Sequence, residues 1–129
     1  MVIDTSALVS ILTSEPDAEQ LEDAIDRDAI RLMSVASVLE TSMVIESRFG
    51  ADGERELDLL IRRLPIEIRA VDRDQLEWAR FAFRTYGRGR HAAALNFGDC
   101  FAYALAKVTG EPLLYKGSDF GRTDLVSAI

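Results

Sequence analysis

Four short apolar runs, separated from one another by amphipathic segments, constrain the fold of this chain more than any other feature. The runs are VI at residues 2–3, IRLMSV at 30–35, IEIRAV at 66–71 and PLLYKG at 112–117. Strands that alternate with helices form parallel sheets with helices on both faces. We therefore expect a three-layer α/β/α fold with a central, mostly parallel sheet, and LVSAI at 125–129 as a last short strand.

The segments between these runs have helical apolar spacing and recognisable ends. Thr5 or Ser6 is expected to cap the first helix. Ser14 is expected to cap the second, with Pro16 in its first turn, and Gly50 to end the helix that follows the second strand. The spacing predicts helices over residues 6–12, 14–25, 36–50, 53–64, 72–87 and 97–110.

The length of 129 residues accommodates one domain over residues 1–129. No stretch reaches the length of a membrane span and no basic leader precedes Val2, so we expect a cytoplasmic protein with no membrane segment. The only cysteine, Cys100, excludes an internal disulfide and a cysteine-based zinc cluster. The only histidine, His91, excludes catalysis by a histidine pair.

The formal net charge of −7 taken alone argues against a nucleic-acid partner, because such partners favour basic surfaces. The charges are unevenly distributed, however. Six acids crowd residues 17–28, whereas Arg88 and Arg90 belong to a basic stretch before the last long helix. Either arginine is a candidate to hold phosphate or an ordinary solvated residue, and the same holds for Lys116 after the last predicted strand. Net charge is therefore weak evidence about partners.

Asp4 ends the first apolar run almost as soon as it begins, and it is followed by Thr5 and Ser6. A desolvated, unpaired carboxylate is costly, so other residues must compensate it. Ligands of open α/β sheets gather at the carboxyl ends of the strands, where the following helices also begin. Four acids are expected to converge at that edge, from four distant segments: Asp4, Glu40, Asp99 and Asp119.

Three of these acids also have a structural explanation. Glu40 completes a capping box with Ser37 in the first turn of its predicted helix, and Asp99 is able to act in the same way behind Asn96. Asp119 has the neighbours of a turn residue.

Clustered carboxylates repel one another unless a proton or a cation lies among them, and oxygen-only ligands suit Mg²⁺ or Mn²⁺. Such an ion polarises phosphoryl oxygens and activates water.

Four stretches of the chain resemble the PIN-domain ribonucleases, and most closely the VapC toxins of bacterial type II toxin–antitoxin pairs. They are IDTSALVSIL, ASVLETSMVI, FGDCFAYALA and LLYKGSDF, and they span essentially the whole chain in order. The resemblance implies a PIN-like domain and a Mg²⁺-dependent endoribonuclease, with Mn²⁺ as a substitute, that cleaves RNA. It also implies a cognate antitoxin and a homodimer.

By motif, the resemblance assigns metal binding to Asp4 and Asp99 and the two remaining acidic positions to Glu40 and Asp119. Asp124 is an alternative for the last position. The family also has a hydroxyl that supports the first aspartate, and here that position matches Thr5 or Ser6.

Two other classes of function stay open. In a phosphorelay receiver, Asp72 after the third strand would be the phosphoacceptor and Lys116 the strand-end lysine. Receivers need a pair of acids after the first strand, however, and this reading leaves Glu40 and Asp99 unused. The other class is a catalytically silent module that only binds an antitoxin. Metal titration and an RNA cleavage assay separate the three hypotheses.

Overall fold

The computed structural model describes residues 1–129, and strands and helices alternate along them as the sequence predicts. The elements are β1 (Val2–Ile3), α1 (Thr5–Leu12), α2 (Ala18–Arg27), β2 (Leu32–Ser34), α3 (Val35–Arg63), β3 (Glu67–Arg69), α4 (Arg73–Tyr86), α5 (Phe97–Thr109), β4 (Leu113–Leu114) and the 3₁₀ turn η1 (Phe120–Arg122). No helix is both long and apolar enough to cross a membrane.

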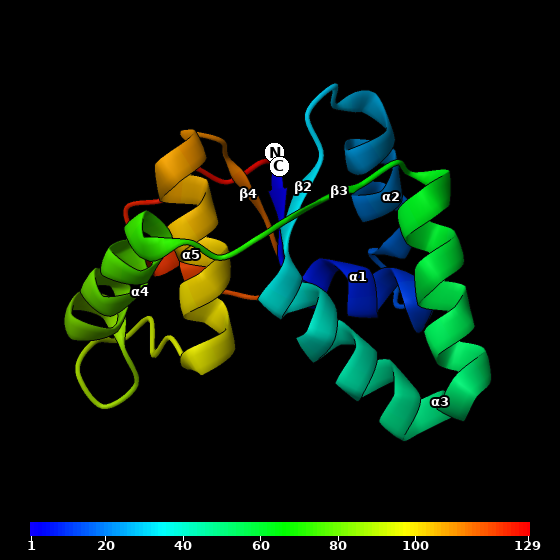
Figure 1. The fold of residues 1–129 in the computed structure, drawn as a ribbon, viewed down its shortest axis with the longest axis horizontal. Coiled ribbons are helices and arrows are strands. Elements are labelled where there is room, and N and C mark those ends of the chain that lie inside the picture. Colours follow the sequence, from blue (N-terminus) through cyan, green and yellow to red (C-terminus); the bar gives the residue numbers. More distant parts are fainter.

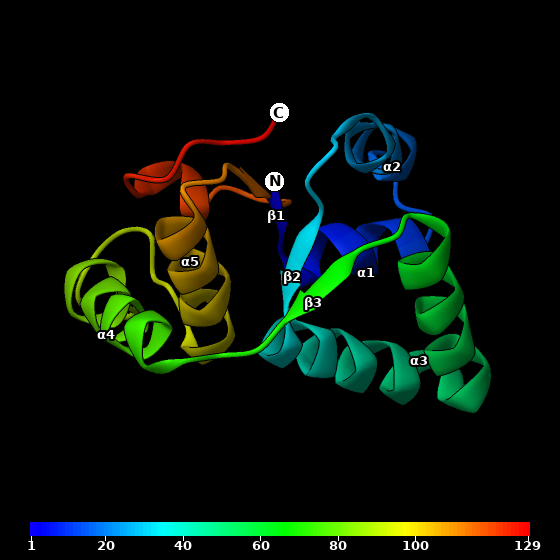
Figure 2. The same ribbon diagram turned by 45° about the horizontal axis from the view of Figure 1, so that its top comes forward.

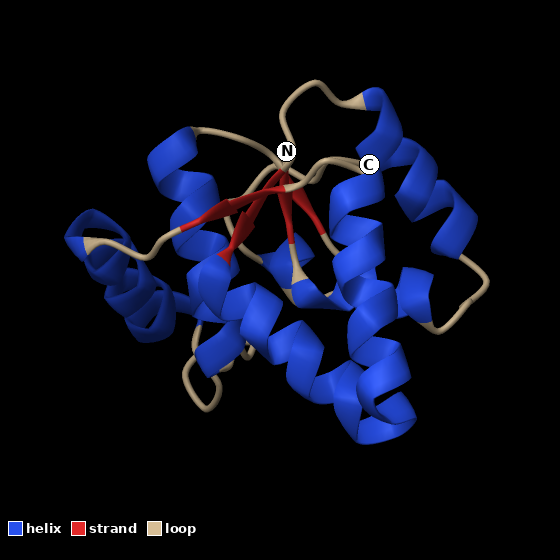
Figure 3. Cartoon of the chain, turned by 45° about the vertical axis from the view of Figure 1, so that its right-hand side comes forward, coloured by secondary structure: helices blue, strands red, loops and turns tan.

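The sheet has the strand order β3-β2-β1-β4, and every pairing in it is parallel. Helices α4 and α5 cover one face, and α1, α2 and α3 cover the other (Figures 1 and 3). The predicted three-layer α/β/α class is thus confirmed, with a fully parallel sheet. The central strand β1 directs its carboxyl end toward the side of the molecule where α1, α3 and α5 begin (Figure 1).

Each face of the sheet has its own apolar cluster, because successive residues of a strand point to opposite faces. Ile3, Met33 and Leu114 pack on the side of α1, α2 and the second half of α3. Their neighbours Val2 and Leu113 pack on the side of α5. Both residues of β1 are fully buried. The end of this strand is therefore a fixed point from which Asp4 is positioned.

The two helices predicted over residues 36–50 and 53–64 form one element, α3, that bends sharply at Gly50. This glycine has φ 66° and ψ −154°, which is outside the helical region. The bend turns the second half of α3 back along α1 and α2 (Figures 1 and 2). There Leu57 and Leu60 join the core, and Arg63 forms an ion pair with Glu22.

The predicted caps of the first two helices were wrong. Asp4 itself caps α1, since its carboxylate accepts a hydrogen bond from the backbone N–H of Ser6 at 3.0 Å. The second helix begins at Ala18 behind Asp17 rather than at Ser14, whose φ of 55° is incompatible with a helix start. Pro16 therefore precedes this helix instead of lying in its first turn.

IEIRAV forms the strand β3 as predicted, at the edge of the sheet, and all three residues of β3 are exposed. One strand prediction needs correction. LVSAI contributes no strand, since only Ser127 forms an isolated bridge, with Leu113.

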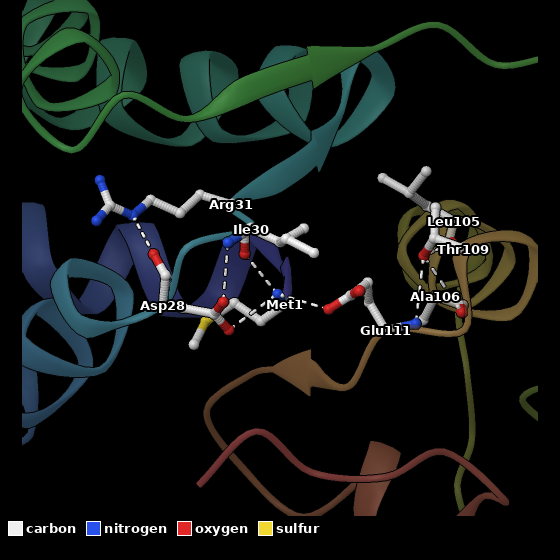
Figure 4. A network of polar contacts seen from close by, with 8 residues as sticks. All are labelled: Met1, Asp28, Ile30, Arg31, Leu105, Ala106, Thr109 and Glu111. Carbon is white, nitrogen blue, oxygen red and sulfur yellow. Dashed lines mark hydrogen bonds and ion pairs between the residues drawn. The ribbon is translucent and has the colours of Figure 1, made fainter.

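The amino end of the sheet is closed by a polar network around Met1 (Figure 4). The terminal ammonium group donates to Asp28 Oδ2 and Glu111 Oε2, each at 3.0 Å, and to the carbonyl of Ile30 at 2.5 Å. The backbone N–H of Ile30 in turn donates to Asp28 and, together with the ammonium group, lowers the pKa of that carboxyl. The network joins β1 to the segments before β2 and β4, at the end of the sheet opposite Asp4.

Candidate functional site

Asp4 lies in the interior, at the point where β1 ends and α1 begins. Its side chain is only 4% exposed. The Oδ2 atom accepts two hydrogen bonds from Ser6, from the hydroxyl at 2.6 Å and from the backbone N–H. Burial nevertheless raises the pKa of Asp4, and the charge of Glu40 adds to this effect. The backbone N–H of Thr5 also lowers the pKa of this carboxyl, but burial outweighs the hydrogen bonds.

Of the two candidate supporting hydroxyls, Ser6 contacts Asp4 and Thr5 does not. The Ser6 oxygen itself accepts a hydrogen bond from the backbone N–H of Lys116 at 2.9 Å, so the segment after β4 helps to orient it. Thr5 donates instead to the carbonyl of Ser37 at 3.2 Å, which ties the start of α1 to α3. Ser6 is therefore the residue that positions the Asp4 carboxylate.

Asp99 occupies the first turn of α5 and forms the predicted capping box with Asn96. The Asn96 side chain accepts from the backbone N–H of Asp99 at 2.9 Å, and Asp99 Oδ2 accepts from the backbone N–H of Asn96 at 3.0 Å. A single hydrogen bond to Oδ2 leaves Oδ1 of Asp99 available. The capping and site interpretations of this residue are therefore compatible.

Glu40 lies in the second turn of α3, not in the first as predicted. Ser34 caps α3 by accepting from the backbone N–H of Ala36 at 3.3 Å, so the capping box proposed between Ser37 and Glu40 does not form. With no role at the helix end, the Glu40 side chain instead reaches across to α5, where its carboxylate lies against Gly98.

The charges of the acids converge on Asp99. The pKa of Asp99 is raised to about 6, mainly by burial and in addition by the charges of Asp4, Glu40 and Asp119, against the opposing hydrogen bond from the backbone N–H of Asn96. Asp119 is exposed and immediately precedes η1. The four segments that carry these acids thus meet at the carboxyl edge of the sheet, where α/β folds bind their ligands.

Asp124 lies elsewhere. Its carboxylate accepts from the Tyr103 hydroxyl at 2.8 Å and from Lys107 at 2.7 Å. Lys107 is eight residues after Asp99, about 12 Å along the helix. Burial alone would raise the pKa of Asp124, but the hydrogen bonds from Lys107 and Tyr103 outweigh it and lower this pKa. Between the two acids considered for the last position, Asp119 is the one whose charge reaches Asp99.

The candidate basic residues differ in their surroundings. Arg88 and Arg90 are exposed in the loop between α4 and α5, and this loop leads directly to the start of α5 (Figure 1). Arg90 lies over the Phe83 ring, 5.0 Å from its centre. Lys116 forms ion pairs with Glu15 and with Asp17, the latter at 3.3 Å, rather than with the four acids. Its charge is thus already balanced.

The donor set fits a hard divalent cation. The structure contains no group of three or more His, Cys, Asp or Glu side chains arranged to bind one ion as they stand. Mg²⁺, however, is commonly held by one or two carboxylates with water in its remaining positions. Burial and the charges of neighbouring acids raise the pKa of both Asp4 and Asp99, so a bound cation would stabilise their ionised forms.

Comparison with known proteins identifies the family of this chain. The PIN domain family model matches residues 1–126. Ribonuclease VapC30 of Mycobacterium tuberculosis is 60% identical over 127 residues, which are 98% of this chain and 97% of the relative. This chain belongs to the VapC ribonucleases of the PIN-domain family. A VapC ribonuclease of Mycolicibacterium smegmatis is 62% identical over 98% of both chains. The family predicted from the four sequence stretches is thereby confirmed.

The fold is shared with more distant VapC proteins. The crystal structure of Mycobacterium tuberculosis VapC20, described as a toxin that cleaves the sarcin–ricin loop, superimposes with a TM-score of 0.79. The match covers 97% of this chain and 95% of VapC20 at only 16% sequence identity. The fold is therefore shared by two chains whose sequences have diverged widely.

Sequence reasoning missed Gly98 and the backbone contact from Lys116 to Ser6. A signal for Gly98 was present, because glycine is a poor helix residue and here it stands in the first turn of an otherwise strong helix. The Lys116 contact had no signal, since a backbone N–H is common to every residue type except proline.

Proposed function

We propose that this chain is the toxin of a type II toxin–antitoxin pair and acts in the cytoplasm as a Mg²⁺-dependent endoribonuclease. The observation that supports this most strongly is the convergence of charge on Asp99 from Asp4, Glu40 and Asp119. Membership of the VapC ribonucleases supports RNA as the substrate. Without a cation, four neighbouring carboxylates would repel the phosphodiester that they are meant to cleave.

Each acid has a distinct role in this proposal. Asp4 and Asp99 would hold Mg²⁺, with Ser6 fixing the first carboxylate and Asn96 the second. The bound cation would polarise a phosphoryl oxygen and lower the pKa of a coordinated water. Glu40 and Asp119 are placed to orient the attacking water, and Arg88 and Arg90 to hold flanking phosphates. Mn²⁺ is expected to substitute for Mg²⁺, since both prefer oxygen ligands.

The experiment that tests the metal dependence is cleavage of an RNA pool by the purified chain. We expect no cleavage in excess EDTA, restoration by Mg²⁺ or Mn²⁺, and no restoration by Ca²⁺ at equal concentration. Cleavage that continued undiminished in EDTA would refute the metal mechanism. A chain that never cleaved RNA with any of these ions would instead favour a silent antitoxin-binding module.

A homodimer is the second part of the proposal. Helices α4 and α5 enclose a groove of about 400 Å³ that is lined mainly by apolar side chains: Val71, Leu76, Ala79, Arg80, Phe83, Arg84, Phe97, Cys100 and Phe101. Phe97 in this groove is 82% exposed, and Leu39 and Met43 on the first half of α3 are more than half exposed. Exposed apolar surface of this extent supports a subunit interface on these helices.

The antitoxin is expected to bind at the other helical layer. A hollow of about 240 Å³ between the end of α1 and the bend of α3 is lined by Leu12, Ile45, Phe49, Asp52, Gly53 and Glu56. Apolar walls with two acids at the rim fit an amphipathic, basic segment of a partner. If the purified complex with its antitoxin cleaved RNA as fast as the free chain, an inhibitory antitoxin would be ruled out.

The receiver-like alternative finds no support in the structure. Asp72, its phosphoacceptor, caps α4 by accepting from the backbone N–H of Gln75 at 2.9 Å. Lys116, its strand-end lysine, is paired with Glu15 and Asp17.

A further inference from the structure

Gly98, the second residue of α5, supports the carboxylate of Glu40 from α3. A Cβ atom built on Gly98 would lie 1.9 Å from Oε2, 2.6 Å from Cδ and 2.8 Å from Oε1 of that carboxylate. All three of the nearest atoms therefore belong to the end of one side chain. The Glu40 carboxylate occupies the space that any residue other than glycine would fill.

The backbone of α5 gives no other reason for glycine at this position. Gly98 does not have the positive φ found at Gly50, Gly89, Gly110 and Gly117. Glycine in a helix loses more conformational freedom on folding than any other residue does. Alanine would thus be the better helix residue at position 98, and the atoms nearest to its Cβ would all belong to the Glu40 carboxylate.

We propose that Gly98 is a positioning residue for Glu40. By lacking a Cβ atom it lets the carboxylate lie against the first turn of α5, next to Asp99, where the exposed N–H groups of the helix end also favour a negative charge. This inference rests on the proposed function, because a carboxylate placed there matters only if the acids act together on a metal ion and its substrate.

Gly53 in α3 is a second crowded glycine, but its surroundings differ from those of Gly98. A Cβ on Gly53 in α3 would lie 2.7 Å from Phe49 Cβ and 2.8 Å from Ile45 Cγ2, and 3.1 Å from the Ile45 carbonyl oxygen. Those atoms belong to the backbone and to the rigid stems of side chains. Substitution at Gly53 should therefore reduce stability, whereas substitution at Gly98 should move only the flexible end of Glu40.

The test compares wild type, Gly98→Ala, Glu40→Ala and the double variant Glu40→Ala/Gly98→Ala, with Gly53→Ala as the matched control. Three quantities are measured for each: Mn²⁺ affinity by calorimetry without RNA, the rate of RNA cleavage, and the metal-free melting temperature. We expect Gly98→Ala to lose about 10- to 100-fold in Mn²⁺ affinity and cleavage, as removal of an outer-shell partner does. Its melting temperature should be unchanged or higher.

The double variant shows whether Gly98 acts through Glu40. Gly98→Ala should add nothing to Glu40→Ala in Mn²⁺ affinity or cleavage, because the carboxylate it displaces is already absent. Gly53→Ala is the control for stability alone, and it should melt at a lower temperature than wild type because the atoms that its Cβ would meet cannot move aside. The inference would be overturned if Gly98→Ala matched wild type in Mn²⁺ affinity, or if it caused the same loss with and without Glu40.

Failure of the proposed function is distinguishable from failure of this inference. A wild-type chain that bound Mn²⁺ but cleaved no RNA would refute the ribonuclease, while the Mn²⁺ affinities of the four proteins would still decide the role of Gly98. A wild-type chain that bound no Mn²⁺ would contradict both.

Discussion

At the scale of single residues, Asp99 has the most informative environment in the molecule. Its pKa of about 6 exceeds the ordinary 3.8 because the carboxyl is partly buried and faces three other acids. Between these two pKa values the folded chain binds a proton that the unfolded chain releases. Metal-free protein should therefore lose stability as the pH rises from about 4 through 6, and Asp4, whose pKa is also raised by burial, acts in the same direction.

The predicted loss between pH 4.5 and 7 is about 1–2 kcal/mol, which is less than the full shift implies because solvent screens a partly exposed group. Urea unfolding in EDTA at several pH values measures it, with Asp99→Asn as the control in which this contribution is absent. The same stability profile for wild type and Asp99→Asn would show that Asp99 titrates normally.

The four acids illustrate what the sequence reveals at this scale. Asp4, Asp99 and Asp119 were predictable as neighbours, because parallel strands bring their carboxyl ends and the following helix starts to one edge. The position of Glu40 in its helix was not, since Ser37-Val-Leu-Glu40 reads equally well as a capping box. Only the structure shows that α3 begins earlier, at Val35, and that Glu40 reaches Gly98.

At the scale of elements, the loop between α4 and α5 is proposed to bind RNA phosphates, and this role is tested by substitution of its arginines. Changing Arg88 and Arg90 to Ala should weaken RNA binding and lower the slope of log affinity against log salt by about 1.4, or 0.7 for each phosphate contact to single-stranded RNA. Binding is measured on the Asp4→Asn background, so that the RNA is not cleaved.

The matched control for this loop is the pair Arg55→Ala and Arg62→Ala in the second half of α3. Both residues are exposed, so the change in net charge is the same, but they lie outside the loop that leads to Asp99. Equal slopes in the two double variants would mean that Arg88 and Arg90 are ordinary surface residues.

The elements themselves were largely predictable, and their ends were not. Apolar periodicity predicted every α-helix, because a helix that buries one face has apolar residues at regular spacing along the sequence. The start of α2 was misjudged because Ser14 resembles a cap in sequence, whereas its positive φ is set by the tight turn from α1. The strand expected at LVSAI does not form, because only Ser127 bridges to Leu113 and no neighbouring residue extends this pairing.

At the scale of the whole molecule, the proposed homodimer rests on the apolar groove between α4 and α5. Leu76 lines that groove and is 50% exposed, whereas Leu59 on α3 is 49% exposed and lies outside it. Leu76→Glu should convert the dimer to a monomer in light scattering, and Leu59→Glu should leave it intact. A wild type that was monomeric at working concentration would contradict the proposal.

The central claim is that Asp4 and Asp99 hold a catalytic metal ion. Asp4→Asn and Asp99→Asn keep the size of each side chain and its ability to cap a helix, but each removes one negative charge. Metal-free melting temperatures should be unchanged or higher, because repulsion among the acids is relieved.

The decisive measurement pairs those melting temperatures with cleavage of an RNA pool in Mg²⁺ or Mn²⁺. Cleavage should fall by more than the roughly 10- to 100-fold that loss of an outer-shell partner costs, at undiminished stability. Full cleavage by Asp4→Asn, or loss of cleavage only in proportion to unfolding, would contradict the claim.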